Sequence, residues 1–285
     1  MTSRWSALAD LGQSVWYDNV ARPALASGHL ELLLRDDNIT GGTSNPSIFS
    51  KAVLESDLYD EDIRSAPAAS SDDEIFERCS VQDIQRACDL LRPVWERTEG
   101  QDGYISIEEE AALAFGVEPA VRRAHELRGL VDRPNVMVKI PGTEAGVKAF
   151  RQLTREGQSI NMTLLFSHER YRQIADAYVG ALEERVRAGE DVSAIASVAS
   201  FFVSRVDAQA DRQLPDGSPL RGRTPSPTPS SPTPTCSRRS SPRSAGGACA
   251  PSAPTCSARC GRPPEPRARR TRRRCTSTSS SGSTR

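Results

Sequence analysis

Apolar runs of strand length alternate with helix-like patterns along the first 220 residues. A half-buried helix repeats apolar residues every three or four positions, whereas a buried strand is a short continuous run. The patterns predict strands at residues 14–18, 38–43, 104–108, 136–140, 159–166 and 194–202. They predict helices at residues 29–35, 72–97, 119–130, 144–155 and 169–188, and another that begins at Pro46.

The order of these elements predicts an α/β fold with a parallel sheet, because helices separate the strands. Six strand candidates in about 200 residues favour a (β/α)8 barrel over an open sheet. The sequence has neither a Gly-x-Gly-x-x-Gly motif nor a P-loop, which are the usual signals of nucleotide binding. Within the long helical region, Ser80-Val-Gln-Asp83 has the spacing of a helix capping box.

Lys139 lies inside one of the predicted strands, in the apolar run Asn135–Pro141. The chain has only two other lysines, Lys51 and Lys148, so a lysine in a buried strand needs an explanation. Burial disfavours the charged form of an amine, and a neutral amine can form a Schiff base with a ketone or aldehyde. The structural alternative is a lysine on an edge strand whose ammonium extends to water.

Polar residues stand at the end of each predicted strand. In a (β/α)8 barrel the carboxyl ends of the strands converge on the active site. Each residue also has an ordinary alternative: a turn or cap for Asp18, an Asx-turn for Asn45, and a helix cap or solvated charge at the sixth strand. Six successive strand ends with polar groups nevertheless favour a site, and the candidates in chain order are Asp18, Thr43, Asn45, Glu108, Lys139, Asn161, Thr163, Ser200 and Arg205.

Five ordered motifs resemble transaldolases, most closely the actinobacterial type of the pentose phosphate pathway, over about residues 5–220. They are Val15-Trp-Tyr-Asp18, Thr43-Ser-Asn-Pro-Ser-Ile-Phe49, Asp132–Pro141, Ser159–Ser167 and Ser197–Asp207. The resemblance implies a class I aldolase barrel that transfers a dihydroxyacetone unit between sugar phosphates. It implies no metal and no organic cofactor, and an intact barrel would be compatible with a homodimer.

The resemblance also implies a role for each candidate. Lys139 would form the Schiff base with the C2 carbonyl of sedoheptulose 7-phosphate or fructose 6-phosphate. Glu108 and Thr163 would move protons through a water molecule, and Asp18 would take the proton of the C4 hydroxyl. The residues that would bind the substrate hydroxyls and phosphate are Thr43, Asn45, Asn161, Ser200 and Arg205.

One position departs from the family pattern, and another leaves a choice among three residues. Gly142 stands where the family usually has alanine or another small residue. Glu108, Glu109 and Glu110 are consecutive, and Glu108 and Glu110 could share a face of the strand because side chains alternate. The motif Ser106-Ile-Glu108 favours Glu108 as the acid/base residue.

The charge balance divides the chain near residue 220. Residues 1–220 carry 23 Lys plus Arg against 36 Asp plus Glu, a balance of −13, whereas residues 221–285 carry 14 Arg and one acid, Glu265. The second segment holds 11 of the 20 prolines and has no Leu, Ile, Val, Met or aromatic residue. Such a segment cannot bury enough apolar surface to offset its ordering entropy, so we expect residues 221–285 to be disordered.

Two interpretations of this tail are open. An arginine-rich arm is typical of RNA or DNA binding, which makes a nucleic-acid-binding protein an alternative function. The favoured interpretation is translation in the wrong frame, because a one-base shift makes Gly261–Arg267 compatible with Trp-Ala-Ser-Thr-Gly-Thr-Lys. Residues 1–220 would then form a barrel without its last strands, with exposed sheet edges, low stability and little activity. Another Schiff-base aldolase of the same barrel class is a further alternative.

Cysteine usage and hydropathy indicate a cytoplasmic protein. Cys79 and Cys88 lie in helical sequence and are expected to be reduced. Five further cysteines lie in the tail without zinc-site spacing. No run approaches the roughly 18 apolar residues of a membrane span, and the N-terminus has no secretory apolar region.

Overall fold

The computed structural model describes residues 7–9 and 11–223. Its centre is a parallel sheet of six strands, and their order in the sheet is their order in the chain. The strands are β1 (Trp16–Tyr17), β2 (Gly41–Thr43), β3 (Ile105–Glu108), β4 (Val136–Pro141), β5 (Ile160–Leu165) and β6 (Ser197–Phe201). Sequential parallel strands joined by helices are the architecture of a (β/α)8 barrel. The predicted barrel, incomplete in the described residues, is confirmed.

The inner face of this sheet is concave. The Asn161 side chain on β5 reaches the Ser106 side chain on β3, with 3.0 Å between Nδ2 and Oγ, although β4 lies between their strands. The register aligns Glu108 with Lys139 and Lys139 with Asn161. Because side chains that are in register lie on the same face, the structure places these three polar residues at one level inside the curl.

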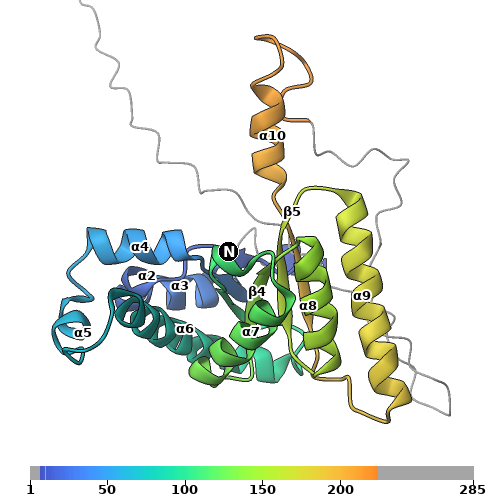
Figure 1. Cartoon of the computed structure of the whole chain (residues 1–285). Helices are drawn as coiled ribbons and strands as arrows, with labels where there is room; N and C mark the ends of the chain where they lie inside the picture. Colours follow the sequence, from blue (N-terminus) through green and yellow to red (C-terminus); the bar gives the residue numbers. More distant parts are fainter. Residues whose placement is uncertain (1–6, 10, 224–285) are drawn as a thin grey trace, which may run out of the picture.

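Helices cover the outer face of the sheet (Figure 1). The predicted long helices are present, and the one expected at residues 72–97 has those bounds. The helices are α2 (Arg22–Ala26), α3 (His29–Asp36), α4 (Pro46–Glu55), α5 (Asp60–Arg64), α6 (Asp72–Arg97), the 3-10 turn η1 (Ala111–Leu113), α7 (Val117–Val131), α8 (Glu144–Arg155), α9 (His168–Arg187) and α10 (Val203–Asp211). The main core lies between these helices and the sheet, where β-branched residues such as Val136, Val138 and Ile140 of β4 are buried.

The capping box of α6 lies nine residues before the predicted one. Ser71 accepts a hydrogen bond from the backbone N–H of Glu74, and the Glu74 carboxylate accepts one from the backbone N–H of Ser71. Ser80 is inside the helix, where its hydroxyl donates to the Glu77 carbonyl at 2.9 Å. The prediction at Ser80 was wrong because the apolar period continues through that position, so no helix begins there.

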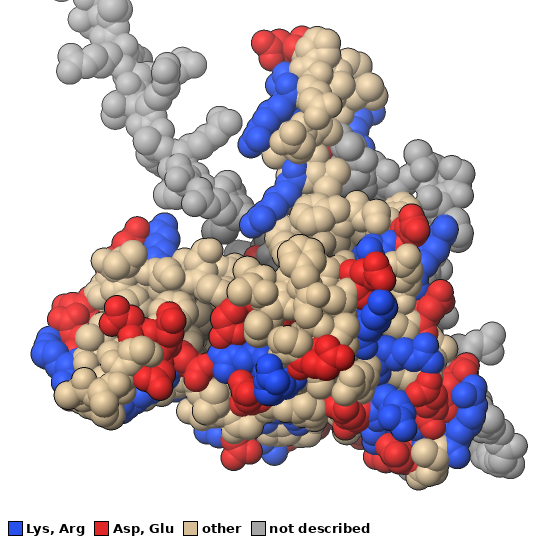
Figure 2. All heavy atoms as spheres, viewed as in Figure 1, with Lys and Arg blue, Asp and Glu red and all other residues tan. Residues whose placement is uncertain are grey.

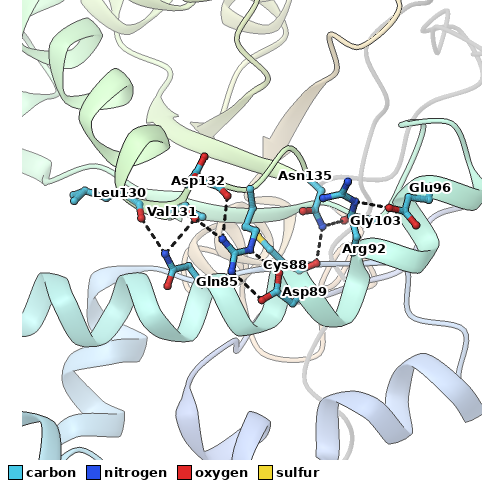
Figure 3. A network of polar contacts seen from close by, with 11 residues as sticks. Gln85, Cys88, Asp89, Arg92, Glu96, Gly103, Leu130, Val131, Asp132 and Asn135 are labelled. Carbon is cyan, nitrogen blue, oxygen red and sulfur yellow. Dashed lines mark hydrogen bonds and ion pairs between the residues drawn. The ribbon is translucent and has the colours of Figure 1, made fainter.

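A polar network ties the amino end of β4 to α6 (Figure 3). The Asn135 amide donates to the backbone carbonyls of Cys88 and Gly103, at 2.9 Å in each case. Gln85 of α6 donates to the Leu130 carbonyl at 3.0 Å, at the end of α7. Asn135 is fully buried, and these bonds fix the position at which β4 begins. They therefore also fix the position of Lys139, four residues further along the chain.

The last described helix differs from the others in its surroundings. Helix α10 extends from the end of β6 away from the layer formed by α7, α8 and α9 (Figure 1), and none of its residues is buried. The predicted tail at residues 221–285 lies outside the described residues, apart from residues 221–223.

Acidic and basic side chains are intermixed over α7, α8 and α9 (Figure 2), so the surface of these three helices is not continuously basic. None of the helices within residues 7–9 and 11–223 combines the length and the hydrophobicity that a bilayer crossing requires.

Candidate active site

Lys139 is buried at the centre of the inner face. Only 1% of the residue is exposed, and all six residues of β4 are buried. Its Nζ lies 3.0 Å from Oε2 of Glu108 and 3.4 Å from the backbone carbonyl oxygen of Ser44, to both of which it donates. An amine beside a carboxylate can pass a proton to it and then act as a nucleophile. The alternative of a lysine that extends to water does not apply.

The three consecutive glutamates have different environments. Glu108 contacts Lys139 and has 14% of its side chain exposed. Glu110 points the other way, to Arg123 of α7, whose Nε lies 3.0 Å from each of its carboxylate oxygens. Although burial opposes the charge, the bonds from Arg123 hold the pKa of Glu110 below its usual value. Among the three, Glu108 is therefore the glutamate placed for proton exchange with Lys139.

Glu109 lies between them, and no hydrogen bond from the described residues offsets the burial of its carboxyl group. The residue is 2% exposed, and neither carboxylate oxygen has a hydrogen-bond partner in the described structure. Burial raises its pKa to about 7, with a further increase from the charges of Glu110 and Glu108 that Arg123 opposes. Its backbone N–H donates to the Lys139 carbonyl at 3.2 Å, so β3 continues to pair with β4 at this residue.

The side chain of Asn161, which is in register with Lys139, contacts the side chain of Ser200 on β6. The Ser200 hydroxyl donates to Oδ1 of Asn161 at 2.8 Å, and the Asn161 amide donates to the Ser106 hydroxyl at 3.0 Å. All three residues are buried, with at most 3% exposed. The network crosses from β6 through β5 to β3 and presents amide and hydroxyl groups beside the amine, which is the chemistry needed to bind a polyhydroxylated ligand.

Thr163 lies two residues after Asn161 on β5, and Thr43 shares a hydrogen-bond acceptor with Lys139. Thr163 of β5 is fully buried, and its hydroxyl makes no hydrogen bond to the described residues. Thr43 ends β2, and its hydroxyl donates at 3.4 Å to the Ser44 carbonyl that also accepts from Lys139. Asp18 follows β1 and is half-buried.

The contacts of Asn45 and Arg205 lie outside this network. Oδ1 of Asn45 accepts a hydrogen bond from the backbone N–H of Ile48 at 3.0 Å, which caps α4. Arg205 is exposed on α10, and its guanidinium carbon lies 4.7 Å from the centre of the Phe202 ring. Within the described residues, no hydrogen bond or ion pair joins Arg205 to Lys139, Glu108, Asn161 or Ser200.

Sequence reasoning did not identify Ser44 and Ser106 as members of the site. Ser106 could have been found, because it stands two residues before Glu108 on the same strand and the strand period of two places both on one face. Ser44 acts through its backbone carbonyl, which leaves no signal in residue type. Within the described part of the chain, no three His, Cys, Asp or Glu side chains gather in a way that could hold a metal ion.

The packing around Gly142 explains why glycine suits this position. A Cβ placed on Gly142 would lie 2.4 Å from a methyl carbon of Leu165, the last residue of β5. Alanine at this position would require the Leu165 side chain to move. In this chain, glycine therefore accommodates the packing of Leu165 at the carboxyl end of β5.

Comparison with known proteins gives the family. Residues 15–227 match the family described as Transaldolase/Fructose-6-phosphate aldolase. The chain belongs to this family. The transaldolase of Thermobifida fusca (strain YX) is 46% identical over 215 residues, which cover 75% of this chain and 58% of that protein.

Two further transaldolases are similar. The one from Mycobacterium tuberculosis (strain ATCC 25618 / H37Rv) is 44% identical over 210 residues, 73% of this chain and 56% of its own length. The one from Acidothermus cellulolyticus is 42% identical over 215 residues, 75% of this chain and 58% of its own length. The chain thus spans a little more than half the length of these relatives, and the predicted resemblance to actinobacterial transaldolases is confirmed.

Proposed function

We propose that this member of the transaldolase/fructose-6-phosphate aldolase family acts on sugar phosphates. It would transfer a dihydroxyacetone unit from sedoheptulose 7-phosphate to glyceraldehyde 3-phosphate, giving erythrose 4-phosphate and fructose 6-phosphate. The observation that carries the proposal is the buried Lys139 amine, 3.0 Å from the Glu108 carboxylate and in register with Asn161. A buried amine with an adjacent proton acceptor is the arrangement that Schiff-base chemistry requires.

In the proposed first half of the reaction, Nζ of Lys139 adds to the C2 carbonyl carbon of the donor ketose. Glu108, through a water molecule next to Thr163, moves two protons in turn from the Lys139 ammonium to the carbonyl oxygen, first to form the carbinolamine and then to release water. The product is an iminium ion on Lys139. The lysine thereby supplies the electrophilic activation that the later bond cleavage needs.

In the second half, Asp18 takes the proton of the C4 hydroxyl. The electron pair of the C3–C4 bond moves to the iminium nitrogen, an enamine forms on Lys139, and the aldose phosphate leaves. An acceptor aldehyde then receives the enamine carbon, and the same steps run in reverse.

Substrate binding completes the proposal. Thr43, Asn45 and Asn161 would hold the hydroxyl groups of the retained three-carbon unit, which would keep it in place until the acceptor arrives. Ser200 and Arg205 would bind the substrate phosphate, and Arg205 would have to approach from its present position on α10.

The second candidate is release rather than transfer, because the family description also includes fructose-6-phosphate aldolase. The two are separated by incubating the chain with fructose 6-phosphate, with and without erythrose 4-phosphate. Transaldolase activity predicts sedoheptulose 7-phosphate only when the acceptor is present. Free dihydroxyacetone at the same rate with and without the acceptor would favour the aldolase. Glu108→Gln should abolish either product, whereas Glu118→Gln on the exposed face of α7 should not.

We propose a division of the chain into a barrel segment, residues 1–220, and a tail, residues 221–285, that is translated out of frame. The family match ends at residue 227, close to the change in composition, which supports this division. Resequencing the gene around codons 215–230 tests it, and an intact reading frame there would contradict it. We further propose a cytoplasmic protein, with a homodimer when the barrel is complete.

A further inference from the structure

Ser106 makes a contact in the inner network for which the proposed mechanism gives no role. It is fully buried on β3, one strand level below Glu108. Its hydroxyl oxygen accepts a hydrogen bond from Nδ2 of Asn161, 3.0 Å away across β4. Ser106 is therefore held where it can act on Asn161, a residue of the proposed substrate site, from two strands away.

Two serine hydroxyls hold the Asn161 amide, one at each end. Ser200 donates to the oxygen end at 2.8 Å, and Ser106 accepts from the nitrogen end at 3.0 Å. A flipped amide would place its oxygen against Ser106 and its nitrogen against Ser200, and both serine hydroxyls would then have to exchange their donor and acceptor roles. In the orientation that the structure has, the second N–H of Nδ2 is the donor that remains for a ligand.

Ser106 is also linked to the segment that holds Lys139. Its backbone carbonyl accepts from the Ser44 hydroxyl at 3.1 Å and from the Ser44 backbone N–H at 3.3 Å. The Ser44 carbonyl in turn accepts from Nζ of Lys139 at 3.4 Å. Ser106 therefore connects the Asn161 side chain, through hydrogen bonds, with the Ser44 backbone that contacts the Lys139 amine.

We propose that Ser106 is a positioning residue that fixes the Asn161 amide with its N–H toward the hydroxyl groups of the retained three-carbon unit, an inference that rests on the proposed transaldolase function. A fixed donor holds the enamine-bound unit until the acceptor arrives. A rotating amide loses that hold for part of the time. Ser106 therefore controls the ratio of release to transfer rather than the formation of the Schiff base.

The first test needs no turnover. The chain contains five asparagines, so labelling with ¹⁵N-asparagine gives five side-chain amide pairs in an NMR spectrum, and the pair missing in Asn161→Asp identifies Asn161. The Asn161 amide protons should exchange slowly with solvent, and Ser106→Ala should speed their exchange at least tenfold. Ser80→Ala, which removes another buried hydroxyl within α6, should leave the rate unchanged. Unchanged exchange in Ser106→Ala would overturn the proposal.

The second test measures partitioning with fructose 6-phosphate and erythrose 4-phosphate. Ser106→Ala should raise the ratio of free dihydroxyacetone to sedoheptulose 7-phosphate about tenfold, equivalent to about 1.4 kcal/mol, while the rate of borohydride-trapped adduct formation stays within twofold. In an Asn161→Ala background the substitution should change nothing further, because it acts through Asn161. An equal effect in both backgrounds, or slower adduct formation, would contradict the positioning role. A wild-type chain that forms no Lys139 adduct refutes the proposed function instead, and the exchange measurement then decides the orientation of Asn161 alone.

Discussion

Ionisation of Glu109 should destabilise the chain as the pH rises through neutrality. The carboxyl group is buried without a hydrogen-bond partner, and its pKa is raised from 4.5 to about 7 by burial and by the charges of Glu110 and Glu108, against Arg123. A folded-state pKa above the unfolded value means that the native protein binds the proton more tightly. The stabilising contribution is therefore complete below about pH 4.5 and is lost as the pH rises through about 7.

The size of the effect follows from the raised pKa. Each unit of pKa difference corresponds to about 1.36 kcal/mol, so the contribution of Glu109 falls by about 3 kcal/mol between acidic pH and about pH 8. Glu109→Gln has nearly the same shape but cannot ionise. We expect this variant to match the wild type near pH 4.5 and to exceed its free energy of unfolding by up to about 3 kcal/mol near pH 8.

The measurement is urea unfolding followed by tryptophan fluorescence at a series of pH values. Wild type, Glu109→Gln and the exposed control Glu118→Gln are compared, so that other titrating groups cancel. The difference between wild type and Glu109→Gln should appear between about pH 5 and 8, and the control should follow the wild type. Parallel curves for wild type and Glu109→Gln over this range would refute the assignment of a buried, neutral Glu109.

Three further substitutions test the packing by urea unfolding. Arg22→Ala should cost about 3–5 kcal/mol, because it leaves the fully buried Asp83 without the guanidinium that lies 2.8 Å away; a cost below about 1 kcal/mol would argue against the pair. Ser71→Ala should cost about 1 kcal/mol by removing the capping box of α6, and no loss would place the helix start elsewhere. Gly103→Ala should cost more than about 1 kcal/mol, since φ is +84° and the new Cβ would lie 2.4 Å from the Trp95 backbone nitrogen; wild-type stability would exclude that backbone conformation.

The regular elements could be predicted because their patterns are strong and local. Helix α8 has the predicted bounds, since Thr143 caps its first turn and buried Ala149, Phe150 and Leu153 form one face. Helix α2 was missed because five residues are too few to establish a period, and its Arg22 is a buried ion-pair partner rather than a surface charge. Such exceptions depend on contacts between distant segments, which no local pattern contains.

The candidate site was partly predictable for the same reason. Strand periodicity places Glu108, Lys139 and Asn161 on one face, and parallel pairing then brings them to one level. The different environments of Glu109 and Glu110 depend on the position of Arg123 in α7, which the strand sequence does not contain. The sequence motif around Arg205 predicts that this residue binds phosphate. The structure places it on the surface, because α10 extends away from the sheet.

Borohydride trapping shows directly whether Lys139 is the Schiff-base residue. The wild-type chain is incubated with fructose 6-phosphate, reduced with borohydride and digested, and the peptides are sequenced by mass spectrometry. We expect one three-carbon or six-carbon adduct, on Lys139 alone, that is absent in Lys139→Met and unaffected in Lys148→Met, a substitution in the exposed part of α8. An adduct on Lys51 or Lys148, or an unmodified Lys139 in folded protein, would contradict it.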